Sequence, residues 1–399
     1  MPPFETIGQQ LTWLLIAIAG IGILAQWLRV PYAVALVLAG LAVGESHLVD
    51  VPHLDPGLLL FVLLPPLLFD AAFRLDAVQF RSLLPSILLI AVPGTLFTAL
   101  FVGAAVSVAL QIPPVTGLLL GTIVAATDPV AVVSVFRRLR APERLTVLAE
   151  GESLINDGMA ITLYTVALGF AISGSFDFGS AISNFGREAL LGSAIGVVIG
   201  LVGSRLTGLT HDHLVEMTLS TALAYGSYLA AQSLHSSGPL ACVMAGLIHG
   251  SYGRRVGMSE NARLLLDDLW EYLGFAANGV VFLLVGFTVS VGGLISYAWP
   301  VALAILSVEV GRVLLIGGLS RRLLPATLAL SRRERVVLFW GGLRGALTLA
   351  LALALPAATP QRELIVAMAF GVVLVTLVVQ GLTLAPLIKA LGVQAPTSS

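Results

Sequence analysis

Several ionisable side chains lie inside long apolar stretches of this sequence, where an ionised group is costly and usually marks a functional site. They are Asp70, Asp128, Glu150, Glu152, Asp157, Glu216, Glu309, Arg312 and Arg344. Carboxylates with nearby hydroxyl groups suit proton transfer or the binding of a hard cation, because hard cations prefer oxygen ligands. Which of these groups act together depends on the helices that hold them.

One of these carboxylates, Asp128, directly precedes a proline. Residues 125–130 read Ala-Ala-Thr-Asp-Pro-Val within an apolar run. Proline removes a backbone donor and clashes with the preceding turn, so the helix is expected to break at Thr127 and Asp128 and to free carbonyl oxygens. Together with the two side chains, these oxygens would suit a small cation. The alternative is a proline kink in which a polar side chain fills the gap.

Residues 150–158 read Glu-Gly-Glu-Ser-Leu-Ile-Asn-Asp-Gly and hold a second polar group. Residues four apart share a helix face, so Ser153 aligns with Asp157, and Glu152 aligns with Asn156. The first pair offers a hydroxyl and a carboxylate that can hold either a proton or a cation. The second pair includes a carboxylate that needs a cationic partner. A structural polar network between helices is the alternative.

Arg312 is the expected partner of Glu152, because a guanidinium keeps its charge and needs an anion nearby. Glu309 is three residues away on the same helix and competes as a local partner. Removing one member of a buried Glu152–Arg312 pair is expected to cost about 3–5 kcal/mol. Asp70 either borders a cation route or lies at the cytoplasmic end of its helix.

Three glycines fall within residues 340–346, which read Trp-Gly-Gly-Leu-Arg-Gly-Ala. They favour an unwound stretch within the membrane, although close packing of helices on glycine is the alternative. Arg344 is expected to compensate helix ends or free carbonyls there. Interrupted helices in corresponding halves of a chain point to a midplane site in an inverted-repeat transporter.

The composition predicts an all-α polytopic membrane protein. Hydrophobic residues make up 57% of the 399 residues and charged residues only 11%, whereas about a quarter of a soluble domain is charged. Soluble enzymes, nucleic-acid-binding proteins and disordered proteins are thereby excluded. The net charge of -1 implies no bulk electrostatic partner, and the single cysteine, Cys242, excludes an intramolecular disulfide. We expect neither an enzyme nor a cofactor.

Uncharged runs locate the helices, because a helix needs about 20 apolar residues to cross a bilayer. Residues 6–28 and 82–127 carry no charge, and Pro113-Pro114 divides the second run in two. The thirteen predicted helices cover residues 8–28, 31–46, 57–73, 83–110, 114–137, 146–173, 187–207, 212–235, 238–250, 269–290, 295–318, 334–357 and 362–391.

The charges between these helices predict an orientation. Most of the 21 Lys and Arg residues fall in alternate connections, and connections rich in basic residues stay in the cytoplasm. This places the N-terminus outside the cell membrane and the C-terminus in the cytoplasm. The acidic Glu45, Asp50 and Asp55 fall in an external connection, which agrees. Residues 1–399 form one transmembrane domain.

Five motifs in order along nearly the whole chain resemble the monovalent cation:proton antiporter family, in its sodium/proton exchanger (NhaP-like) branch. They are Pro65-Pro66-Leu67-Leu68-Phe69-Asp70, Thr127-Asp128-Pro129-Val130-Ala131, Gly151-Glu152-Ser153-Leu154-Ile155-Asn156-Asp157, Gly341-Gly342-Leu343-Arg344-Gly345-Ala346 and Val379-Gln380-Gly381-Leu382-Thr383. The resemblance implies an inverted-repeat fold whose fifth and twelfth helices are discontinuous and cross where they unwind. It also implies a homodimer.

By this resemblance, a core subdomain moves against a dimerisation subdomain. The core covers about 83–173 and 295–391, and the dimerisation part covers about 8–73 and 187–290. Asp157 would carry the transported Na+ or proton. The residues that complete or support its site would be Thr127, Asp128 and Ser153.

The resemblance implies further roles around this site. Glu152 would pair with both Arg312 and Asn156. Because the similar electroneutral branch has Asn before the ion-carrying Asp, Asn156 implies one cation exchanged per proton. Asp70 departs from the family pattern, where Glu is as frequent, so its gating role stays open, and Arg344 is a further candidate pathway residue.

The expected function is secondary active exchange of Na+ or Li+ for H+, with the two ions competing at one carboxylate under alternating access. Such exchange would serve pH homeostasis. A K+/H+ antiporter uses the same machinery and is the nearest alternative. A cation channel would need a continuous pore, and an organic-anion symporter would need a larger polar cavity. The expected partners are these ions, the bilayer and a second copy of the chain, with no nucleic acid.

Overall fold

The computed structural model describes residues 4–28, 30, 32–46, 56–173, 178–319 and 330–393, and this part of the chain is helical with no β-strand. The all-α fold class expected from the sequence is confirmed. Asp50 and Asp55 lie outside the described residues.

The helices follow one another along the chain with short connections. They are α1 (Phe4–Leu28), α2 (Tyr32–Ser46), α3 (Pro56–Phe73), α4 (Ala77–Leu110), α5 (Pro114–Ile123), α6 (Pro129–Arg138), α7 (Glu143–Ser173), α8 (Phe178–Thr207), α9 (His213–Ser233), α10 (Gly238–Ile248), α11 (Arg254–Val256), α12 (Glu260–Thr288), α13 (Val291–Ser296), α14 (Ala298–Val313), α16 (Arg332–Trp340), α17 (Ala346–Leu353), α18 (Arg362–Val375) and α19 (Gly381–Leu391). Short π-helical segments extend three of them, namely η1 (His249–Gly253), η2 (Leu314–Leu319) and η4 (Thr376–Gln380).

Six helical segments of the described chain are long and apolar enough to cross a membrane. They belong to α4, α7, α8, α12, α14 with η2, and α18 through α19, while α1 and α2 qualify only as a bent pair. Interrupted helices fail this length criterion because each half is only about two turns long. Helix is present in each of the thirteen predicted ranges, but the number of membrane crossings stays a prediction.

Three helices begin earlier than the apolar runs predicted. α4 begins at Ala77 rather than near residue 83, α8 at Phe178 rather than near 187, and α12 at Glu260 rather than near 269. The side chain of Asp76 caps α4, and that of Ser259 caps α12. The prediction was wrong here because charged residues end the apolar run but not the helix, which continues beyond the hydrocarbon depth.

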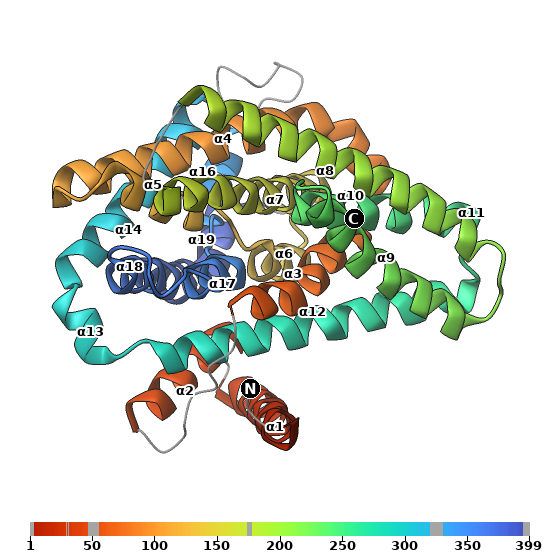
Figure 1. Ribbon diagram of the computed structural model, residues 1–399, viewed down its shortest axis with the longest axis horizontal. Helices are drawn as coiled ribbons and strands as arrows, with labels where there is room; N and C mark the ends of the chain where they lie inside the picture. The colour runs from red at the N-terminus through yellow and green to blue at the C-terminus, as the bar shows by residue number, and fades with distance from the viewer. Residues whose placement is uncertain are drawn as a thin grey trace.

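The long α12 runs along one side of the molecule and α4 and α8 along the opposite side, with α7, α17 and α18 between them (Figure 1). α4 packs against α5, α7 and α14, whereas α12 packs against α2, α3 and α9. Two groups of helices therefore surround the middle of the molecule. Their division into a core and a dimerisation subdomain stays a prediction.

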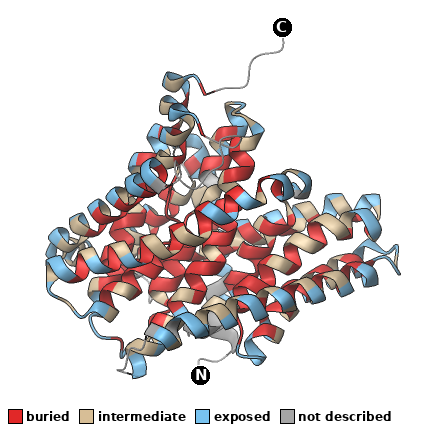
Figure 2. Cartoon of the chain, turned by 90° about the horizontal axis from the view of Figure 1, so that it is seen from above, coloured by how far each residue is buried: buried red, intermediate tan, exposed pale blue. Residues whose placement is uncertain are grey.

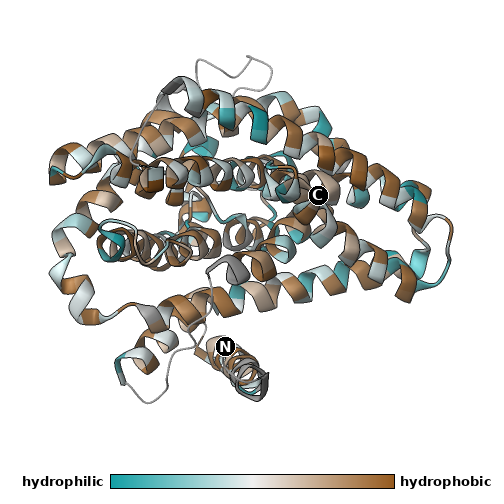
Figure 3. Ribbon diagram, viewed as in Figure 1, coloured by the Kyte–Doolittle hydropathy of each residue, from teal (hydrophilic) through white to brown (hydrophobic). Residues whose placement is uncertain are grey.

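The distribution of side chains suits a protein surrounded by lipid. Large apolar side chains are exposed, such as Trp27, which is 86% exposed, and apolar residues, drawn brown, make up much of the long helices in Figure 3. Buried residues gather in the middle of the molecule in Figure 2, and they include the charged Arg344, which is 1% exposed. A multi-pass membrane protein accounts for this pattern, because lipid favours apolar surface and buried charge needs partners.

Candidate functional site

The first interruption separates α5 from α6. α5 ends at Ile123 and α6 begins at Pro129, so residues 124–128 lack regular helical structure. Pro129 suits the first position of a helix, where its missing N–H costs nothing. The break that the proline predicted is therefore present, and it lies at Thr127 and Asp128 as expected.

The second interruption separates α16 from α17, with residues 341–345 between them. The backbone N–H of Asp128 donates to the carbonyl oxygen of Leu343 at 2.8 Å, so the two unwound segments meet. A Cβ atom added to Gly345 would overlap the Asp128 carboxylate, and one added to Gly342 would overlap the Arg312 guanidinium. The glycines thus allow close approach at the crossing, in addition to unwinding the helix.

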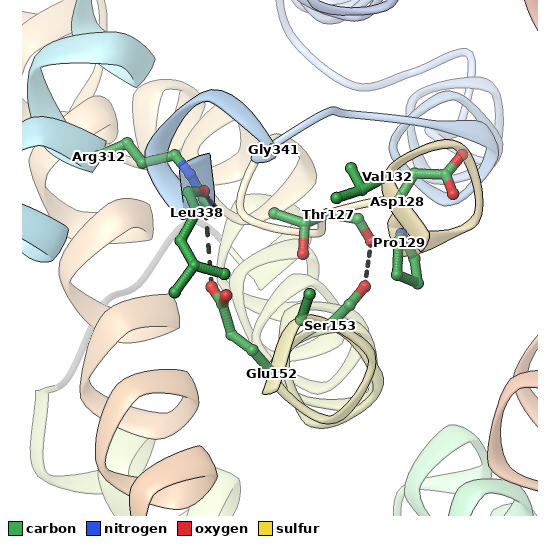
Figure 4. A pocket seen from close by; sticks show the side chains of 10 residues that line it. Thr127, Asp128, Pro129, Val132, Glu152, Ser153, Arg312, Leu338 and Gly341 are labelled. Atoms are coloured by element: carbon green, nitrogen blue, oxygen red, sulfur yellow. Dashed lines mark hydrogen bonds and ion pairs between the residues drawn. The ribbon is translucent and has the colours of Figure 1, made fainter. Parts of the chain in front are cut away.

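Asp128 lies at the N-termini of two half-helices. It directly precedes α6, and its carboxylate packs against Gly345, the N-cap residue of α17. The unsatisfied N–H groups of a helix N-terminus favour a negative charge. In Figure 4 the Asp128 carboxylate points away from Ser153. The negative charge of Asp128 therefore lies where it offsets the positive N-terminal ends of α6 and α17.

Arg344 compensates the C-terminal end of α5. One guanidinium nitrogen lies 2.7 Å from the carbonyl oxygen of Ala125 and 2.8 Å from that of Ala126. The backbone N–H of Arg344 donates to the hydroxyl of Thr376 at 3.2 Å. A buried carbonyl without a donor would be costly. The arginine of one interruption thereby stabilises the free carbonyls of the other.

Arg312 performs the matching task at the end of α16. Its Nε donates to the carbonyl oxygen of Phe339 at 3.1 Å, and its Nη2 donates to that of Leu338 at 2.9 Å. Its Nη1 lies 3.6 Å from Oε1 of Glu152, and both side chains are less than 10% exposed. Glu309, the competing local candidate, instead accepts a hydrogen bond from Gln380 at 2.7 Å.

The polar face of α7 lies against the first interruption. Ser153 donates its hydroxyl proton to the carbonyl oxygen of Thr127 at 2.6 Å, which leaves the lone pairs of Ser153 free. Asn156 donates from Nδ2 to the hydroxyl of Thr127 at 3.2 Å. Asp157 follows one turn beyond Ser153, and its Oδ1 is buried without a hydrogen-bond partner. Four sequence-predicted residues, Thr127, Ser153, Asn156 and Asp157, are thus brought together.

A small pocket lies beside this face, and Figure 4 shows its lining. The lining residues are Thr127, Asp128, Pro129, Val132, Ala149, Glu152, Ser153, Arg312, Leu338 and Gly341. The pocket reaches Ser153 but not Asp157, which is absent from the lining. It therefore adjoins the crossing on the side of the Glu152–Arg312 pair.

Asp70 lies apart from the crossing. Its carboxylate is 3.7 Å from Arg74, which is 2.8 Å from Glu271 of α12. A Cβ atom added to Gly274 of α12 would lie 2.8 Å from the Asp70 carboxylate. The structure thus places Asp70 in a charged cluster between α3 and α12, and not with Asp157.

Sequence reasoning missed two side chains of this network. Thr95 of α4 contacts Asn156, and Gln380 of η4 contacts Glu309. Gln380 was visible within a family motif but had no assigned partner. Thr95 carried no signal, because a single threonine in an apolar helix is common and only packing shows what it faces.

The amino-acid sequence matches a family model and several characterised proteins. The family model described as "Sodium/hydrogen exchanger, transmembrane" matches residues 13–390. The chain is 36% identical over 397 residues to the Na(+)/H(+) antiporter ApNhaP of Aphanothece halophytica, covering 97% of this chain and 76% of that protein. It is 33% identical to the Na(+)/H(+) antiporter NhaH of Halobacillus aidingensis, covering 98% of this chain and all of that protein.

Solved structures show a similar fold. The structure of the sodium proton antiporter MjNhaP1 from Methanocaldococcus jannaschii at pH 8 superposes with a TM-score of 0.81 and 21% sequence identity. The superposition covers 98% of this chain and all of that one. At this identity the likeness establishes the fold alone.

Proposed function

Because the chain belongs to the sodium/hydrogen exchanger family, we propose that it exchanges Na+ for H+ across a membrane, with Asp157 as the shared binding group. The carrying observation is the buried, unpartnered Oδ1 of Asp157 beside the unwound Thr127 segment. A carboxylate oxygen held there without a donor is available to a proton or to a cation. The names of the relatives support sodium as the cation.

Competition at this carboxylate accounts for the coupling. The lone pairs of Ser153 remain available as acceptors because its proton is engaged by the Thr127 carbonyl, and hydroxyl and carboxylate oxygens are suitable ligands for a hard cation. Asp157 accepts either Na+ or H+, and the loaded site is then exposed to the other side. An empty charged site is costly to carry through the dry barrier, so uncoupled return is suppressed.

The stoichiometry we propose is one cation per proton, which makes the exchange electroneutral. The residue before Asp157 is Asn156, which has no charge to titrate, and its carboxamide is already engaged by Thr127 and Thr95. Asp128 is balanced by two helix N-termini, and Glu152 is paired with Arg312. Among the carboxylates at the crossing, Asp157 is therefore the one that can exchange a proton for a cation.

The assembly and orientation are part of the same proposal. The protein forms a homodimer in the cell membrane with its N-terminus outside, and its core subdomain moves against its dimerisation subdomain. Basic residues at the end of α6, Arg137 and Arg138, then lie on the cytoplasmic side. Arg137 pairs with Glu150 at 3.0 Å, and Glu150 is next in the chain to Ala149, which lines the pocket. This proximity favours an approach to the pocket from the cytoplasm.

Ion-driven proton flux in proteoliposomes tests this function. The vesicles would carry an internal pH dye and receive Na+, Li+ or K+ pulses, with the membrane voltage clamped or free. We expect Na+-dependent internal alkalinisation that is insensitive to voltage. It should fall to the level of protein-free vesicles in Asp157→Asn, because an amide can bind neither a proton nor a cation in the same way.

Asp76→Asn is the matched control, since Asp76 caps α4 outside the crossing and Asn is an equally good N-cap. It should exchange ions at the wild-type rate. Retained flux in Asp157→Asn would reject the assignment of the binding group. A response to K+ alone would keep the mechanism and change the substrate, and a current without proton movement would indicate a channel.

A further inference from the structure

The hydroxyl of Thr95 is the beginning of a buried hydrogen-bond chain that leads to the candidate site. Thr95 lies on α4 and is 2% exposed. Its single hydroxyl proton is shared between Oδ1 of Asn156, which is 3.0 Å from Oγ1, and the carbonyl oxygen of Ala91 in its own helix, which is 2.6 Å away. A buried carboxamide needs partners for both of its ends, and Thr95 serves the oxygen end.

Asn156 connects Thr95 to the unwound segment. With Oδ1 directed to Thr95, its Nδ2 is directed to the hydroxyl of Thr127 at 3.2 Å. Ser153 holds the backbone carbonyl of the same threonine. Thr127 is thus positioned twice, through its main chain by Ser153 and through its side chain by Asn156.

We propose that Thr95 is a positioning residue for cation binding, acting through Asn156 on the Thr127 hydroxyl. The inference rests on the proposed exchange at Asp157 and deepens it. Thr95 does not line the pocket, and its hydroxyl bonds to Asn156 and Ala91, so its effect passes through the carboxamide. A donor at Thr95, although shared with the Ala91 carbonyl, favours the orientation in which the Asn156 oxygen faces Thr95 and its nitrogen faces Thr127, because the two ends of a carboxamide have nearly the same shape but opposite hydrogen-bonding character.

Loss of this donor should affect cation binding more than turnover. Without Thr95 the Asn156 oxygen has no partner, the carboxamide is free to turn, and the Thr127 hydroxyl is no longer held in one orientation. A site binds its cation most tightly when neighbouring residues hold the coordinating groups in fixed positions. Removing an outer partner of a metal ligand commonly costs about tenfold in affinity or more.

The experiment compares Thr95→Val and Thr95→Ser in the proteoliposome assay over a range of Na+ and Li+ concentrations. Valine keeps the shape but has no donor, and serine keeps the donor. We expect Thr95→Val to raise KM for Na+ by about tenfold with nearly unchanged maximal rate, and to change the ratio of the Li+ and Na+ KM values. In Thr95→Ser, the KM for Na+ and the ratio of the Li+ and Na+ KM values should stay within about twofold of wild type.

Thr207→Val is the matched control, because Thr207 is equally buried and bonds only to Gly203 of its own helix α8. It should leave KM and the ion ratio unchanged. Wild-type KM and ion ratio in Thr95→Val, or a fall in maximal rate shared with Thr207→Val, would overturn the inference. If Thr95→Val proves too unstable, Thr95→Ala against Thr95→Ser answers the same question. Failure of the wild-type protein to exchange ions would instead reject the proposed function.

Discussion

The two interrupted helices meet at one place but are built from different residues. The segment between α5 and α6 presents oxygen atoms, from the Thr127 side chain, the Asp128 carboxylate and backbone carbonyls that accept from side chains rather than from the helix. The segment between α16 and α17 presents glycines and Arg344. One segment therefore supplies groups that can bind ions, while the other supplies space and positive charge.

The difference shows how an open backbone is kept stable at membrane depth. Non-helical backbone in a membrane must have its polar groups satisfied by the protein. Arg344 satisfies carbonyls at the end of α5, and Arg312 satisfies those at the end of α16. The two helix C-termini are thus served by guanidinium groups, and the two N-termini share the carboxylate of Asp128.

Removing the charge of the glycine-rich segment should have the largest effect on stability. Arg344→Met leaves the carbonyl of Ala125 without its donor and that of Ala126 with only the 3.5 Å contact from Thr348. It also removes the positive charge that acts on Glu309, Glu152 and Asp157. We expect the free energy of unfolding to fall by about 3–5 kcal/mol, measured as the midpoint of thermal unfolding in detergent. Arg344→Lys keeps the charge and should lose less. A wild-type midpoint for Arg344→Met would mean that the two segments do not support each other.

Filling the space of the same segment should have the next largest effect. In Gly345→Ala the new methyl group overlaps the Asp128 carboxylate, so overpacking should cost about 2–3 kcal/mol and displace the first segment. Na+-driven proton flux should fall with it. Gly381→Ala is the control, because a Cβ atom at Gly381 meets nothing within 4 Å. Equal flux in both variants would show that the close approach is unimportant.

Neutralising Glu152 should have the smallest effect of the three. In Glu152→Gln, Arg312 keeps its hydrogen bonds to the carbonyl oxygens of Leu338 and Phe339. We therefore expect the free energy of unfolding to fall by about 1 kcal/mol, rather than by the 3–5 kcal/mol expected of an isolated buried pair. Thermal unfolding of Glu152→Gln measures this, with the exposed Glu143→Gln of the same helix as control. A loss as large as that of Arg344→Met would show that the ion pair dominates over the carbonyl contacts.

Much of the site was predictable because its signals are local. Proline after Asp128 predicts a break, glycines at 341, 342 and 345 predict another, and the four-residue spacing in α7 predicts the face shared by Ser153 and Asp157. These inferences depend on backbone chemistry and helical period alone. Helix starts were predicted less well, because charge ends an apolar run before it ends a helix.

The sequence by itself determined that the chain is an all-helical membrane protein, that two of its helices are interrupted, and that several carboxylates lie within its apolar stretches. Composition and short-range spacing are sufficient for those conclusions. Only the tertiary structure decided that Arg344 serves the end of α5, that Arg312 serves α16 as well as Glu152, and that Thr95 contacts Asn156. A contact such as that between Arg344 and Ala125, which are 219 positions apart, depends on how the helices pack, and no local pattern encodes that packing.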